Sequence, residues 1–160
     1  INYKILLFFK YYIFFIILLA GAAACAWGIS RADFRRRIIP DAYLFPLLLI
    51  GLVVTLFFPW PVTPSDGAIA AVAGYTLTSL IGLIFEKIHP SQTPPIGMGD
   101  VKLISVAGIW LGSVGLAGAL TLACILGIIW GATKKQKYIP FGPFLIIGGI
   151  LSLITITFLI

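Results

Sequence analysis

The stretch "SRADFRRRIIPDAYLFP", residues 30–46, separates two long apolar segments of the chain. It contains four arginines and two aspartates, whereas the segments on either side carry very little charge. A short charged connector between apolar segments of about 20 residues is typical of neighbouring transmembrane helices. The stretch therefore predicts an all-α fold, that of a polytopic integral membrane protein.

The composition of the whole chain agrees with this prediction. Of its 160 residues, 61% are hydrophobic and 10% are charged, whereas soluble domains carry about 25% charged residues. The length allows about six short spans and leaves little for a soluble domain, so we expect a single transmembrane domain over residues 1–160. The net charge of +6 reports topology in a membrane protein, and no nucleic-acid partner is expected.

Apolar runs and proline or glycine breaks divide the chain into about six predicted spans. The prolines of "PWPVTPSDG", residues 59–67, prevent the second span from continuing. The fourth span is the shortest, and "GS" at residues 112–113 marks its turn into the fifth. The approximate bounds are Tyr11–Ser30, Asp41–Phe58, Gly67–Phe85, Val101–Leu111, Val114–Ala132 and Phe141–Ile160.

Basic residues predict how these spans are oriented. With six spans, the first, third and fifth connectors share one side and carry nine basic residues, whereas Lys4 and Lys10 lie on the other side. By the positive-inside rule, the basic side is cytoplasmic and both termini are non-cytoplasmic. Of the five acidic residues, only Asp66 then lies outside. The nine basic residues are Arg31, Arg35, Arg36, Arg37, Lys87, Lys102, Lys134, Lys135 and Lys137.

The two aspartates of the opening stretch differ in how well helix chemistry accounts for them. Pro40 suits the first position of a helix, and Asp41 then lies in the first turn, where the macrodipole favours a carboxylate. Asp33 instead follows the last apolar turn of the first helix, where the dipole disfavours a carboxylate. It is either a loop residue neutralised by the adjacent arginines or a functional group.

Asp100 closes "GMGD", residues 97–100, at the start of the fourth span. It is either an ordinary helix N-cap or a catalytic carboxylate. Gly97 and Gly99 permit close approach of another segment because they have no side chain, and Pro94 and Pro95 stiffen the preceding chain.

An aspartyl peptidase needs at least two carboxyl groups close together, and two carboxylates from different helices on one membrane face could meet this need. A close pair holds one shared proton, so one group acts as the acid and the other as the base. The helix ends alone predict that Asp33 holds this proton. Two alternatives stay open. One is a small transporter or ion pathway that uses the same carboxylates, and the other is a structural scaffold.

Three motifs resemble the type IV prepilin peptidase family. They are "GMGDVKLISVAGIWLG" at residues 97–112, Asp33 followed seven residues later by Pro40-Asp41, and "IPFGPFLIIGG" at residues 139–149. The resemblance implies a six-helix intramembrane aspartyl endopeptidase with Asp33 and Asp100 as the catalytic pair and Asp41 accessory. The implied substrates are type IV prepilins or pseudopilins, whose basic leader is removed at the cytoplasmic face of the bacterial inner membrane.

Further expectations concern support, cofactors and partners. Gly97, Gly99, Asp41 and Lys102 are expected to support the site, and Lys102 either contacts substrate or lipid phosphate or only marks topology.

Two dispersed cysteines and one histidine predict no metal, and no cofactor is expected. The paired C-x-x-C insertion of longer members is absent here, so N-methylation is not expected, and the chain is interpreted as a short member or a fragment. Membrane lipids are expected partners, and the oligomeric state is left open.

Overall fold

The computed structural model describes residues 3–90, 96–134 and 139–159. Pro94, Pro95, Lys135 and Lys137, which entered the sequence argument, lie outside the described residues, as does the side chain of Lys4. The described chain forms helices only, which confirms the all-α class. The helices are α1 (Tyr3–Arg36), α2 (Asp41–Phe57), α3 (Pro64–Ile88), α4 (Met98–Lys134) and α5 (Phe141–Leu159).

The first helix is longer than predicted at both ends. α1 contains 34 residues and continues through Arg36, so most of the charged run after Ser30 is helical rather than a connector. The helix ends at Arg37, whose φ of 56° is left-handed and whose N–H donates to the carbonyl of Asp33 at 3.0 Å. A left-handed residue of this kind is a common helix stop. Asp33 therefore lies in the last turn of α1 and not after it.

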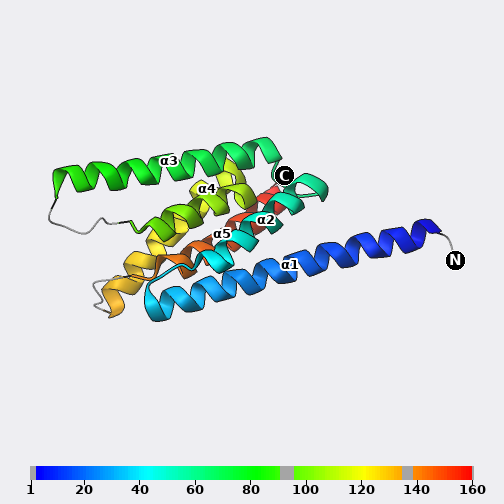
Figure 1. Cartoon of the computed structure of the whole chain (residues 1–160), viewed down its shortest axis with the longest axis horizontal. Helices are drawn as coiled ribbons and strands as arrows, with labels where there is room; N and C mark the ends of the chain where they lie inside the picture. The colour runs from blue at the N-terminus through cyan, green and yellow to red at the C-terminus, as the bar shows by residue number, and fades with distance from the viewer. Residues whose placement is uncertain (1–2, 91–95, 135–138, 160) are drawn as a thin grey trace.

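α4 contains both the fourth and the fifth predicted spans. Their boundary is Gly112, with φ 65° and ψ −175°, a conformation that is essentially restricted to glycine. The start of α4 lies beside Asp33 and its Trp130 ring lies 5.8 Å from that of Phe34, whereas Gly112 lies against Asp66 at the other end of the bundle. The chain therefore doubles back at Gly112, as the green-yellow and yellow halves of α4 show (Figure 1).

Glycines bring the central helices into close contact. A Cβ atom on Gly108 would lie 2.5 Å from the backbone nitrogen of Ala71 in α3, and one on Gly148 of α5 would lie 2.6 Å from the carbonyl oxygen of Ala119. Small residues allow this backbone-to-backbone packing, which replaces the hydrophobic driving force inside a membrane. α4 is thereby packed between α3 and α5 (Figure 1).

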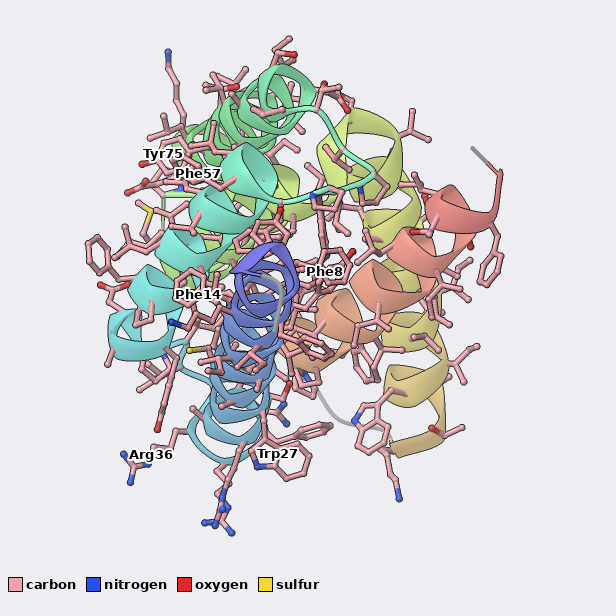
Figure 2. The ribbon with its side chains drawn as sticks, turned by 90° about the vertical axis from the view of Figure 1, so that its right-hand side faces the viewer. Phe8, Phe14, Trp27, Arg36, Phe57 and Tyr75 are labelled. Carbon is pink, nitrogen blue, oxygen red and sulfur yellow. The ribbon has the colours of Figure 1, made fainter. Side chains whose placement is uncertain are left out.

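The outer surface is apolar, as expected for a polytopic membrane protein. Trp27 and Phe57 are each 71% exposed, and Figure 2 shows Trp27 and Arg36 at the lower edge of the molecule. Within the described ranges, four helices are long and apolar enough to cross a membrane by length and composition, namely Phe8–Arg36, Pro64–Ile88, Met98–Lys134 and Phe141–Phe158. The apolar helix α2, Asp41–Phe57, is shorter.

Candidate active site

Asp33 is held in the interior by the start of α5. Its side chain is 5% exposed, and among the described residues it is the one charged group that is buried. Its Oδ2 accepts a hydrogen bond from the backbone N–H of Gly142 at 2.8 Å. Burial of a carboxylate is costly unless such a partner is supplied, so the contact with α5 explains how the fold accommodates Asp33.

The α5 contact changes the electrostatic argument made from sequence. The end of α1 disfavours a carboxylate at Asp33, but the first turn of α5 presents the opposite end of a helix dipole to the same group. The prediction that Asp33 holds the shared proton compared the helix ends that carry Asp33 and Asp100 and did not include α5, so it stays a prediction. Gly142 was missed as a site residue, although the "IPFGPFLIIGG" motif that contains it was recognised. A backbone donor leaves no side-chain signal in the sequence.

Asp100 lies in the first turn of α4 and is half-buried. The helix begins at Met98, so Asp100 is inside the helix rather than at its cap. A Cβ on Gly97 would lie 3.3 Å from Asp100 Oδ2, and a Cβ on Gly99 would lie 3.0 Å from the Cβ of Ile39. The two glycines thus let the turn before α4 approach the carboxyl group on one side and the α1–α2 connector on the other.

Asp33 and Asp100 line one cavity of about 230 Å³. Their carboxyl groups are close enough to interact electrostatically, and Arg37 acts on Asp33 from the end of α1. Two carboxyl groups that interact in this way do not both ionise readily. The remaining lining residues are Arg37, Ile38, Ile39, Gly97, Met98 and Gly99.

Asp41 and Lys102 form a separate feature beside this cavity. Lys102 Nζ lies 2.9 Å from each carboxylate oxygen of Asp41, and the Asp41 and Lys102 side chains are 69% and 43% exposed. The ion pair connects the first turn of α2 to α4 and lines a second cavity of about 460 Å³ together with Tyr75. Two of the four residues predicted as support are therefore paired with each other and do not line the cavity of Asp33 and Asp100.

Other candidate ligands are dispersed. His89 stacks on Phe85 at the end of α3, with ring centroids 4.8 Å apart. Within the described ranges, no three His, Cys, Asp or Glu side chains gather where they could hold a metal ion. The chemistry that this arrangement supports directly is acid–base chemistry by two carboxyl groups.

The chain is similar to known proteins over most of its length. The model of the type IV leader peptidase family matches residues 16–132. A prepilin leader peptidase/N-methyltransferase of Burkholderia pseudomallei is 33% identical over 150 residues, which cover 84% of this chain and 47% of the relative. Proteins of the same name from Pectobacterium carotovorum subsp. carotovorum and Aeromonas salmonicida are 31% and 33% identical over 129 residues, covering 76% of this chain.

The chain spans about half the length of the curated relatives it matches, between 43% and 47%. No solved structure matches it. The family match covers both Asp33 and Asp100 and ends before α5. On the extent of that match and the identity to these relatives, the chain belongs to the type IV leader peptidase family.

Proposed function

We propose that this chain is an intramembrane aspartyl endopeptidase that removes the basic leader of type IV prepilins or pseudopilins. The observation that carries the proposal is the cavity shared by Asp33 of α1 and Asp100 of α4. Membership of the type IV leader peptidase family and the names of the relatives support it. Gly97, Gly99, Asp41 and Lys102 would shape the entrance to this site, and no metal or cofactor is invoked.

The proposed topology has six passes, both termini non-cytoplasmic, and the carboxylate pair facing the cytoplasm of a bacterial inner membrane. The reversal of α4 at Gly112 supports it, because α4 then contributes two passes. Arg37 lies in the same cavity as the two aspartates, and Lys102 lies half a turn beyond Asp100 in α4. The end of the bundle that holds the site is thus the end rich in basic residues, as expected of a cytoplasmic face bordered by lipid headgroups.

The proposed reaction uses one water molecule between the two carboxyl groups. The ionised carboxylate takes a proton from the water, and the water oxygen attacks the carbonyl carbon of the scissile peptide bond. The protonated carboxyl group gives its proton to the carbonyl oxygen at the same time. The tetrahedral intermediate then collapses and the carbon–nitrogen bond breaks. The leaving nitrogen takes the proton that the first carboxyl group received from water, and the second carboxylate recovers a proton from a hydroxyl group of the intermediate.

Cleavage of a prepilin by the purified chain in detergent tests the proposal. Asp33→Asn and Asp100→Asn each remove one acid–base group and are expected to lower the cleavage rate by about 10²- to 10⁴-fold. Glu86→Gln is the matched control, because Glu86 is an exposed carboxyl group on α3 that lines neither cavity. It should leave the rate unchanged. Substantial cleavage by either Asn variant would refute the proposed catalytic pair.

The placement of the acidic residues argues against the transporter alternative. A pathway for ions or polar solutes needs polar groups along the membrane, whereas the acidic residues lie at or near the helix ends. Flux into proteoliposomes that is lost in Asp33→Asn, in the absence of any cleavage by the unaltered chain, would support the transporter instead.

A further inference from the structure

We propose that Gly142 is a positioning residue, whose backbone N–H at the start of α5 holds Asp33 as the ionised carboxylate of the pair and leaves the shared proton on Asp100. The inference rests on the proposed peptidase function for its role in the reaction. Its geometric basis is independent of that function, because the hydrogen bond between Gly142 and Asp33 is a feature of the fold.

The start of α5 has an unusual supply of backbone donors. The first N–H groups of a helix have no partner inside the helix, and a carboxylate near them is stabilised. Here "PFGP", residues 140–143, places one proline just before α5 and a second at the third residue of the helix, and proline has no N–H. The donors that remain at these four positions belong to Phe141 and Gly142. The Gly142 N–H is directed at Asp33 Oδ2, at 2.8 Å in a buried environment.

The contact with Asp33 also favours a glycine at position 142. A Cβ atom there would lie 3.0 Å from Asp33 Oδ2 and 3.6 Å from Asp33 Cγ, closer than the carboxylate tolerates without moving. In addition, a residue before proline is disfavoured in helical geometry because its Cβ meets the proline ring, and Gly142 precedes Pro143. Glycine removes both conflicts, so the donor and the carboxylate are able to meet.

The charges around the pair point the same way. Arg37 of α1 acts on Asp33, and α5 contains no charged residue. From α4, Asp100 faces Asp33, whereas Lys134 is set back over the Trp130 ring. Asp41 of α2 is paired with Lys102. Each carboxyl group has a backbone donor, Gly142 for Asp33 and Gly97 for Asp100. Asp33 has in addition the neighbouring cation Arg37, whereas Asp100 has the charge of Asp33 beside it. The negative charge is therefore better supported on Asp33.

Infrared absorption by protonated carboxyl groups, followed against pH, tests the inference without requiring cleavage. The chain has five acidic side chains, so individual bands can be assigned by substitution. The carboxyl group left in Asp100→Asn, which is Asp33, is expected to ionise at a lower pH than the one left in Asp33→Asn. Adding Gly142→Pro, which deletes the donor, should move the Asp33 titration upward by about one pH unit. The Asp100 titration should not move when the same change is added to Asp33→Asn.

Gly142→Ala covers the case in which the proline variant does not fold, as judged by circular dichroism. It keeps the N–H but displaces the carboxylate, so a shift in the same direction is expected. Gly149→Ala is the control, because a Cβ there meets Leu111 at an ordinary 3.4 Å, and it should shift neither titration. Unshifted Asp33 titrations, or equal shifts of both aspartates, would overturn the inference. A selective shift in a chain that cleaves no prepilin would refute the peptidase function and leave the assignment of Gly142 standing.

Discussion

At each end of the helical bundle, an aspartate accepts a hydrogen bond from the start of another helical segment. At one end, Asp66 of α3 accepts the backbone N–H of Ser113 at 3.0 Å and its hydroxyl at 2.5 Å, just after the reversal at Gly112. At the other end, Asp33 accepts the N–H of Gly142. Both carboxylates thus meet the beginning of a helical segment of another part of the chain.

The two carboxylates differ in how many of their oxygens have a described hydrogen-bond donor. Both oxygens of Asp66 have a donor, and the group is half-buried beside the turn that it stabilises. The bond described for Asp33 engages Oδ2, and the group is buried in a cavity opposite Asp100. A carboxylate with both oxygens satisfied by donors fixes a structure. A buried one that faces a second carboxyl group retains capacity for proton transfer.

Substitution of Asp33 and of Asp66 by asparagine should have the most different effects on prepilin cleavage. Asp33→Asn is expected to reduce prepilin cleavage by about 10²- to 10⁴-fold, whereas Asp66→Asn should keep the rate per folded molecule within about twofold, because Asp66 lies far from the cavity. Initial rates normalised to the folded fraction would measure this. Equal losses in the two variants would mean that the ends are not functionally distinct.

Gly112→Ala should have the largest effect on stability. Its φ of 65° and ψ of −175° disfavour any residue with a Cβ, and that Cβ would collide with the Asp66 carboxylate and approach Val62 Cγ1 at 2.9 Å. We expect a loss of about 3 kcal/mol in the free energy of unfolding. Thermal unfolding in detergent would measure it, with Gly82→Ala as the control, because a Cβ at Gly82 meets no atom within 4 Å. An unchanged midpoint for Gly112→Ala would contradict the role given to this turn.

Ser113→Ala should have a smaller effect at the same end. It removes the hydroxyl bond to Asp66 Oδ1 and keeps the backbone bond to Oδ2, so we expect a loss of about 1 kcal/mol. In the double variant with Asp66→Asn the two losses should not add, because the residues share one interaction. Full additivity would show that Asp66 does not act through Ser113.

The ion pair between Asp41 and Lys102 should matter least. Because solvent reaches both side chains, which are 69% exposed for Asp41 and 43% for Lys102, Lys102→Met is expected to change the free energy of unfolding by less than about 1 kcal/mol. Its effect on cleavage should stay within about threefold. A much larger loss of cleavage with unchanged stability would place Lys102 in contact with the substrate, and would make the site larger than the shared cavity.

The sequence predicted those parts of the molecule that are encoded in side-chain type. Apolar runs predicted the helical segments. Because carboxylates are rare in an apolar chain, Asp33 and Asp100 could be selected as candidate site residues. The extension of α1 through Arg36 was not predicted, because charged residues in the last turn of a helix look the same as charged residues in a loop. The ion pair between Asp41 and Lys102 joins residues 61 positions apart. Local sequence patterns do not predict contacts over such a distance. Gly142 was missed because its contribution is a backbone group.

The hydrogen bond between Asp33 and Gly142 joins two residues that are 109 positions apart. Synthesis proceeds from the N-terminus, so Asp33 and Asp100 are both made before the donor that holds Asp33 in place. A nascent chain that stops short of α5 carries both aspartates but lacks the backbone group that fixes one of them. The order of synthesis thus keeps the site incomplete until the last helix has been inserted and packed.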